Sequence, residues 1–189
     1  AFANSTGITN VNIGNSVTHI GNFAFYTCLN LTNVNLPNSI TNIGDSTFYF
    51  CIDLIKATIP DSVTAIGEYA FYNCASLTSI SIPNAVTRIG TSAFLNGFSL
   101  TNVTIGDSVI TIGERAFSSC YSLTNVTIPN SVISIGTSAF ADGTRLTDVR
   151  IGNNVTSIGT AAFSSCISLT NVAIPTSTTN IQSYAFYSC

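Results

Sequence analysis

Apolar and polar residues follow one another in a fixed order along this chain, and the whole pattern returns every 23 residues without an insertion. A fixed period in the range of about 20–50 residues is typical of a solenoid, in which each unit buries its apolar face only by stacking on its neighbours. The pattern therefore predicts a single repeat domain over residues 1–189, built from about eight coils. Its most regular column is a phenylalanine, present as Phe2, Phe25, Phe48, Phe71, Phe94, Phe117, Phe140, Phe163 and Phe186.

The first half of each unit carries three apolar columns, as in Leu123, Val126 and Ile128, with polar residues between them. The alternation at the end of this spacing predicts a short strand with one set of side chains inside and the other outside. A residue such as Pro129, or a glycine in other copies, then ends the strand. Asn130 and its neighbouring serine provide the turn chemistry that follows.

The second half of the unit opens with apolar residues three apart, such as Val63 and Ile66, which predict a second short extended stretch on the opposite wall. Gly67 follows, where we expect a glycine to turn the backbone with little steric strain. Glu68 then has the position of an acid or N-cap residue at the start of a helix. The Ala-Phe pair behind it is therefore predicted to lie on one turn of α- or 3₁₀-helix, with the Phe71 column as the spine of the core.

The string LTNVTIPNSVISIGTSAF at residues 123–140, followed by a Cys or Gly three residues after the Phe, resembles the BspA-type leucine-rich repeat, and the likeness covers essentially the whole chain. The resemblance implies a mainly β, right-handed leucine-rich-repeat solenoid with short helical turns. Proteins of that family are surface or secreted proteins of host-associated bacteria and some parasitic protists, and members are linked to adhesion. The resemblance therefore implies an extracellular or cell-surface location and protein partners such as extracellular-matrix or cell-surface proteins.

The six cysteines all occupy one column, the third residue after the Phe, where Gly97 and Gly143 fill two copies. A column in which Cys and Gly interchange requires a small residue, so our leading interpretation is a row of buried free thiols. Disulfides between neighbouring coils, for example Cys28 with Cys51, remain a sterically allowed alternative at a separation of about 5 Å. The chain has no CxxC motif and one histidine, so we expect neither a metal site nor another cofactor.

Charged residues make up 7% of the chain, and the formal net charge is −3 with five basic residues in total. This composition argues against nucleic-acid partners. No apolar run approaches the length of about 18 residues that spans a bilayer, so we expect no membrane insertion. Because the chain begins and ends within a repeat, we interpret it as a fragment of a longer array. His19 lies in a variable column and the acids are spread one per coil, so we expect no enzymatic activity.

The outward positions of the first predicted strand form what we call the strand face, which is the inner, usually concave, binding surface of leucine-rich repeats. Lys56 and the Asp148 and Arg150 pair interrupt its neutral Asn, Ser and Thr composition. The alternative is a solvated ladder whose cross-strand ion pair is worth little. The uncharged candidate binding residues on this face are Asn102, Thr104, Asn125 and Thr127.

A second irregularity is aromatic. Three tyrosines, which we call the tyrosine row, directly follow the core Phe in successive copies: Tyr26, Tyr49 and Tyr72. With Phe23, Phe50 and Tyr69 nearby they form an aromatic strip in the N-terminal half, and exposed aromatic patches often mark partner sites. The alternative is that these rings pack across coils and cover the phenylalanine spine.

Two functions of different kinds follow from these features. The first is an adhesive or recognition module that binds host or neighbouring-cell macromolecules through the strand face or the aromatic strip. The second is a passive structural spacer or stalk. Ice binding through threonine rows such as Thr78 and Thr101 is a remote third alternative. Phe2 and Phe186 would leave the spine uncovered at both ends, which predicts end-to-end self-association.

Overall fold

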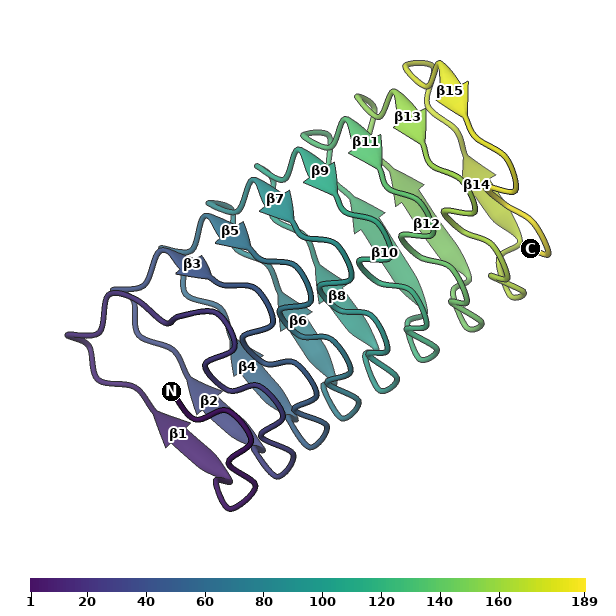
Figure 1. Ribbon diagram of the computed structural model, residues 1–189. Helices are drawn as coiled ribbons and strands as arrows, with labels where there is room; N and C mark the ends of the chain where they lie inside the picture. Colours follow the sequence, from purple (N-terminus) through teal and green to yellow (C-terminus); the bar gives the residue numbers. More distant parts are fainter.

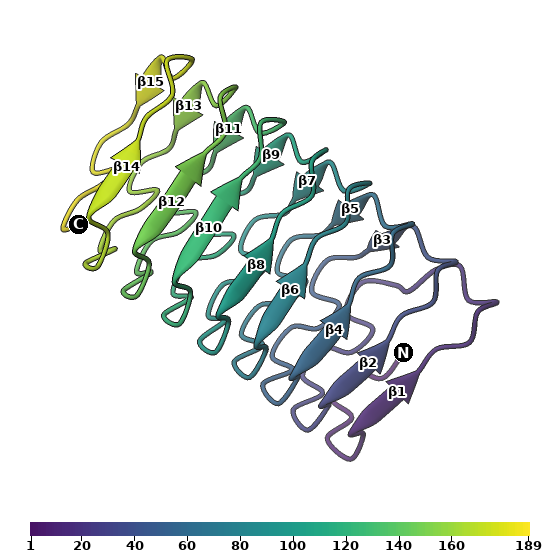
Figure 2. The same ribbon diagram turned by 180° about the vertical axis from the view of Figure 1, so that it is seen from behind.

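The protein is a parallel β-solenoid without helices, and the computed structural model describes all residues 1–189. Figures 1 and 2 show one elongated stack of coils with the termini at opposite ends. One wall carries the longer strands β1 (Asn10–Asn12), β2 (Asn33–Asn35), β4 (Lys56–Thr58), β6 (Ser79–Ser81), β8 (Asn102–Thr104), β10 (Asn125–Ile128), β12 (Asp148–Ile151) and β14 (Asn171–Ala173). The second wall carries the two-residue strands β3 (Asn42–Ile43), β5 (Ala65–Ile66), β7 (Arg88–Ile89), β9 (Thr111–Ile112), β11 (Ser134–Ile135), β13 (Ser157–Ile158) and β15 (Asn180–Ile181).

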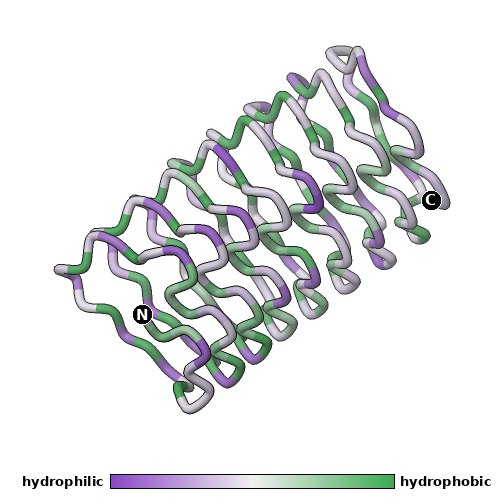
Figure 3. Tube along the Cα trace, viewed as in Figure 1, coloured by the Kyte–Doolittle hydropathy of each residue, from purple (hydrophilic) through white to green (hydrophobic).

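The predicted solenoid is confirmed by the register of both sheets. Every strand pair is parallel and joins residues 23 positions apart, such as Val11 with Val34 and Ile135 with Ile158. The number of coils differs slightly from the prediction. Only seven coils have both strands, because the first coil has β1 but no short strand paired with β3. Figure 3 shows apolar and polar stretches following the same order around the successive coils.

The predicted helical turn around the core Phe is wrong, because this third wall consists of consecutive tight turns. An α-helix would direct its amides to carbonyls within the same coil. Here alternate amides instead donate to the next coil, and the amides between them close turns of the Tyr72 N to Tyr69 O kind, at 3.1 Å. In the third coil the bonds to the next coil are Tyr69 N to Thr91 O at 2.9 Å, Phe71 N to Ala93 O at 2.7 Å and Asn73 N to Leu95 O at 2.8 Å.

The expected N-caps also act between coils rather than within a helix. The Asn22 side-chain carbonyl accepts a hydrogen bond from the Asp45 amide at 3.0 Å, and an Asp45 carboxylate oxygen accepts one from the Glu68 amide at 2.8 Å. These side chains satisfy backbone donors of the following coil, as an N-cap does at a helix start. They therefore help to hold the register of the array.

The glycine column lies where the sequence predicts a turn, but the expected reason for it is wrong. No glycine has a positive φ. A Cβ at Gly90 would instead lie 2.5 Å from the carbonyl atoms of Gly67, and a Cβ at Gly113 would lie 2.7 Å from the carbonyl carbon of Gly90. Glycine is required here because the backbones of neighbouring coils approach too closely for a side chain.

The left-handed backbone positions fall on other residues. Positive φ values occur at two columns of the tight-turn wall, and one of these columns contains Thr27, Asn73 and Asn96. Asn tolerates this conformation, whereas a β-branched residue is strained in it. Thr27, with φ of 56°, also buries a hydroxyl oxygen that has no hydrogen-bond partner.

The phenylalanine column forms the predicted spine of the core. Adjacent rings are stacked with centroids 5.1–5.4 Å apart along the whole array. The seven rings from Phe25 to Phe163 are fully buried, whereas Phe186 in the last coil is half-buried. Each interior ring is thus covered on both faces by copies of itself.

The cysteine column contains free thiols, as the leading interpretation predicts, and five of the six are buried. Each thiol donates to the carbonyl of the phenylalanine in the preceding coil, as Cys74 does to Phe48 at 3.2 Å. Burial raises the pKa of Cys51, Cys120 and Cys166 to about 12. Cys189, in the last coil, is exposed.

We expect Phe94→Ala to reduce the free energy of unfolding by about 3–5 kcal/mol, because it removes a fully buried ring and leaves a cavity between two coils. Phe186→Ala removes a ring that is covered on one face only, so its effect should be clearly smaller. Urea denaturation followed by circular dichroism measures both. Equal losses in the two variants would contradict the stacked-spine account.

We expect Thr27→Asn to raise the free energy of unfolding by about 1 kcal/mol, because it relieves a strained β-branched residue and removes an unpaired hydroxyl. The reverse change, Asn73→Thr, places the same strain in an equivalent coil and should destabilise the protein. Thermal unfolding of both variants tests the prediction. A lower melting temperature for Thr27→Asn would show that the left-handed turn is not strained by threonine.

The thiol pKa values predict a loss of stability in base. Between pH about 9 and 12 the unfolded chain has released thiol protons that the folded protein retains, so the free energy of unfolding falls as the pH rises. The stabilising effect is complete below pH about 9, where both states keep the protons. Urea titrations from pH 7 to about 11 measure the slope. The triple variant Cys51→Ala, Cys120→Ala, Cys166→Ala should show a shallower fall, and identical slopes would contradict the assignment.

Candidate interaction surfaces

The structure brings the predicted strand-face residues onto one wall. All of them are exposed, and they lie on four strands: Lys56 on β4, Asn102 and Thr104 on β8, Asn125 and Thr127 on β10, and Asp148 and Arg150 on β12. The register places Asn125 beside Asp148 and Thr127 beside Arg150. Their role in binding stays a prediction, because exposure and adjacency alone do not define a ligand.

Asn side chains at the start of the strand face pair with their own copies. The Asn33 amide donates to Asn10 at 3.2 Å, and the Asn35 amide donates to Asn12 at 3.0 Å. These ladders use side-chain hydrogen-bonding groups that a ligand would otherwise meet. The outward Asn and Thr side chains of β8 and β10 make no such bond to each other, and the Asn125 amide donates only to the adjacent Thr124 hydroxyl, at 3.1 Å. Most of the donors and acceptors in this part of the strand face therefore stay available.

The strand wall is interrupted at the same place. On this wall β1, β2, β4, β6 and β8 form one sheet and β10, β12 and β14 form another, so no ladder joins β8 to β10. The same two coils stay bonded on the other walls, where β9 pairs with β11 and the Phe117 amide donates to Ala139 at 2.7 Å. A hollow of about 290 Å³ occupies the gap, lined by Asn102, Val103, Thr104, Ile105, Asn125 and Thr127.

A second hollow lies beside Lys56. β4 and β6 are paired through Lys56 and Ser79 alone, whereas β6 and β8 are paired at three positions. Ala57 provides a smaller inward side chain than Val34 and Ile80 in the neighbouring copies. The hollow has a volume of about 300 Å³ and is lined by Lys56, Ala57, Thr58, Ile59, Asp61, Ser79, Ser81 and Pro83.

Asp148 and Arg150 form an ion pair, with Arg150 Nε 3.4 Å from Asp148 Oδ2. The alternative interpretation of the sequence, a solvated ladder, assumed a cross-strand pair, but both residues lie on β12, so this detail of it is wrong. The two side chains are 55% and 77% exposed, and such pairs contribute at most about 1 kcal/mol to stability. The ion pair therefore contributes little to the stability of the fold.

The aromatic strip lies on the tight-turn wall. The rings of the tyrosine row are stacked, with centroids 4.8 Å apart for Tyr26 and Tyr49 and 4.7 Å for Tyr49 and Tyr72. All three tyrosines are half-buried, and burial together with the neighbouring tyrosines raises the pKa of Tyr49. The rings thus pack across coils, as one sequence interpretation expects, while their edges stay accessible, as the other requires.

The remaining members of the strip flank the tyrosine row. Phe50 packs at a tilt against Tyr49 and Tyr72, with centroids 4.9 and 5.6 Å away. Phe23 and Tyr69 meet the row edge-on and are 51% and 38% exposed. None of the tyrosine hydroxyls in the strip has a protein hydrogen-bond partner. The strip is therefore an apolar ridge that carries unused hydroxyl groups.

Sequence reasoning missed a smaller aromatic pair. The rings of Phe98 and Tyr121 are stacked 5.3 Å apart, and both are exposed. Their column, which directly follows the Cys or Gly, reads Leu29, Ile52 and Ala75 in the earlier copies. Because that column mixes aliphatic and aromatic residues, two neighbouring rings in it were the available signal.

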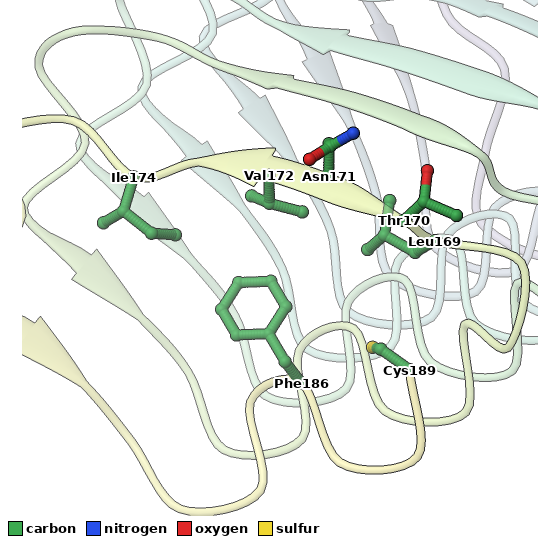
Figure 4. A pocket seen from close by; sticks show the side chains of 7 residues that line it. All are labelled: Leu169, Thr170, Asn171, Val172, Ile174, Phe186 and Cys189. Carbon is green, nitrogen blue, oxygen red and sulfur yellow. The ribbon is translucent and has the colours of Figure 1, made fainter.

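The last coil shows the surface that an inner coil presents to its successor. Figure 4 shows Phe186 directed toward Val172 of β14, with no further coil over them in these 189 residues. The resulting hollow has a volume of about 270 Å³ and is lined by Leu169, Thr170, Asn171, Val172, Ile174, Phe186 and Cys189. This apolar surface underlies the expected end-to-end association, which stays a prediction.

No group of three or more His, Cys, Asp or Glu side chains lies together as metal ligands would. The structure also contains no helix with the length and hydrophobicity needed to cross a membrane. The surfaces described above are polar hollows, an aromatic ridge and an apolar end on a repeating scaffold. The 23-residue period and the parallel register of both sheets place the protein in the class of leucine-rich-repeat solenoids.

Within this class the chain belongs to the BspA-type leucine-rich repeat family. The family model matches residues 1–121 and 64–189, with six copies of the repeat region. The family predicted from the sequence is therefore confirmed. No curated protein matches the chain significantly.

Several solved structures have the same fold. A leucine-rich repeat protein from Bacteroides ovatus is 33% identical, with a TM-score of 0.90, and the match covers 96% of this chain and 47% of that protein. The leucine-rich repeat protein of T. pallidum is 28% identical, with a TM-score of 0.71, covering 92% of this chain and 68% of that one. A leucine-rich cell surface protein from Faecalibacterium prausnitzii is 28% identical, with a TM-score of 0.57, covering 95% and 70%. The chain thus spans about half the length of the Bacteroides protein.

Proposed function

We propose that this protein is a non-enzymatic interaction and adhesion module of a secreted or cell-surface protein. It binds macromolecules of a host or of neighbouring cells, such as extracellular-matrix or cell-surface proteins, through its strand face or its aromatic strip. The observation that carries the proposal is the hollow between β8 and β10, where the strand ladder stops and polar side chains without cross-strand partners remain. The similarity to a leucine-rich cell surface protein supports the proposed location.

The hollow suits a polar protein surface. The Asn102 and Asn125 amides and the Thr104 and Thr127 hydroxyls provide both donors and acceptors around an apolar floor of Val103 and Ile105. The backbone edges of β8 and β10 add hydrogen-bonding groups that no ladder satisfies. Interfaces combine such polar groups with buried apolar contact, so the hollow has the composition of a recognition site.

The alternative, a passive spacer, is favoured by the uniformity of the other coils. Uniform columns would serve to separate two domains without any ligand. The irregular coils argue against this function, since a spacer gains nothing from an interrupted ladder or from a row of stacked tyrosines in three successive coils.

Ice binding is disfavoured by the threonine geometry. The Thr101 hydroxyl donates to the Thr78 carbonyl at 3.0 Å, and the Thr147 hydroxyl donates to the Thr124 carbonyl at 3.0 Å. Each hydroxyl proton is thus used to join two coils. Ile55 in this column also interrupts the row.

The proposal is tested by surface-immobilised binding of the protein to a panel of matrix proteins, mucins and glycans. We expect saturable binding to at least one member. The variant Asn102→Ala, Asn125→Ala should weaken it about tenfold, because it removes two polar groups from the hollow. The variant Asp148→Ala, Arg150→Ala tests the neighbouring ion pair on the same face.

Asn33→Ala on β2 is the matched control, since it removes the same kind of side chain from the strand face at a position that lines none of the hollows. All variants should unfold at the wild-type urea midpoint, because the changed side chains are exposed. Flat binding traces across the panel with folded protein would favour the spacer instead.

A further inference from the structure

The aromatic strip has a geometry that selects among protein partners. The tyrosine row advances in parallel steps of 4.8 and 4.7 Å, so Tyr26 and Tyr72 stand about 9.5 Å apart across two coils. The ring faces cover one another, and a ligand therefore meets ring edges, hydroxyl groups and the flanking rings of Phe23, Phe50 and Tyr69. The strip is a ridge of fixed spacing rather than a pocket for a single ring.

A polyproline II helix matches this spacing. It has three residues per turn and a rise of about 3.1 Å per residue, so every third side chain returns to the same face after about 9.3 Å. One turn of such a peptide therefore spans the distance from Tyr26 to Tyr72. Its pyrrolidine rings are apolar and can pack on aromatic side chains. The helix itself is already formed in the free peptide, so less conformational entropy is lost on binding.

The unused hydroxyls match the same ligand. A polyproline II segment makes no internal hydrogen bonds, so its carbonyls point outward and need donors. The Tyr26, Tyr49, Tyr69 and Tyr72 hydroxyls have no protein partner and can donate to such carbonyls. A helix or a strand in a sheet would already have satisfied its own carbonyls and would gain less from this row.

Charge indicates which proline-rich segments fit. Residues 1–87 contain the strip and one basic residue, Lys56, whereas residues 88–189 contain four acidic and four basic residues. Residues 1–87 thus carry a net charge of −3, and Arg88, which directly follows them, pairs with one of their acids, Glu68, at 3.6 Å. The acidic residues of this part are Asp45, Asp53, Asp61 and Glu68. A basic peptide is consequently attracted to this end of the array.

We propose that the aromatic strip binds a proline-rich, positively charged peptide segment in the polyproline II conformation. This inference rests on the proposed interaction function and names the partner class for one of its two surfaces. The pyrrolidine rings pack on the ridge, the tyrosine hydroxyls donate to peptide carbonyls, and basic side chains lie toward the acidic residues.

The test is fluorescence anisotropy with a labelled 12-residue peptide of repeating Arg-Pro-Pro. We expect saturable binding that falls about tenfold in the variant Tyr49→Ser, Tyr72→Ser. Serine occupies this column at Ser118 and Ser164, so the substitution suits the turn. The double variant Tyr49→Phe, Tyr72→Phe keeps both rings and removes only the two hydroxyl groups. It should therefore lose only the part of the affinity that comes from hydrogen bonds to the peptide carbonyls. Urea unfolding verifies that each variant remains folded.

Matched peptides and a second surface provide the controls. An Arg-Ala-Ala peptide keeps the charge without the polyproline II helix and should bind at least about tenfold more weakly. A Glu-Pro-Pro peptide should also bind weakly because its charge is repelled. Asp148→Ala with Arg150→Ala should leave peptide binding unchanged.

The inference is overturned if Arg-Pro-Pro does not bind the wild-type protein, if Arg-Ala-Ala binds equally well, or if the tyrosine substitutions have no effect. Panel binding that is lost in the Asn102→Ala, Asn125→Ala variant would in that case still uphold the proposed function. Absence of binding in both experiments would overturn the two together.

Discussion

The close and constant distance between neighbouring coils is the constraint on which the rest of the structure depends. Parallel ladders hold strands about 4.8 Å apart, and the phenylalanine rings, at 5.1–5.4 Å, stack at nearly that spacing. At this distance the Gly67, Gly90 and Gly113 column has no room for a Cβ. The core contains stacked flat rings and small thiols because bulkier side chains would not fit between coils at this distance. The distance between coils therefore limits the size and shape of the residue that each column of the repeat can hold.

The constraint explains which parts of the fold the sequence predicts. Apolar columns such as Leu123, Val126 and Ile128 reveal the long strand, because alternation is a local signal. The tight-turn wall was predicted incorrectly, because an acid followed by Ala-Phe has the same local pattern in a helix start and in two consecutive turns. The deciding interactions are bonds such as Phe71 N to Ala93 O, which join different coils. Glycine was placed correctly for the wrong reason, since close approach between coils is equally non-local.

The candidate surfaces also include features that the sequence predicts and features that it does not. Alternation alone places Asn102 and Asn125 on the outside, and the fixed register makes the stacking of the tyrosine row a direct consequence of its column. The break between β8 and β10 was not predictable, because both strands read Asn-Val-Thr. The Phe98 and Tyr121 pair was overlooked because Leu29, Ile52 and Ala75 hold the same column elsewhere.

A repeating scaffold gives a ligand little to distinguish one coil from the next, so selectivity must come from the coils that depart from the repeat. The interrupted ladder between β8 and β10 and the aromatic strip lie on different walls and differ in chemistry, the first being polar and the second aromatic. In a solenoid each coil contacts only its neighbours, so a ligand held on one wall acts first on the junction that it bridges. At the β8 and β10 junction two walls remain bonded. A ligand seated in that hollow would add interactions on the wall where the ladder is missing, and binding there would stabilise the array at the junction with the fewest hydrogen bonds of its own.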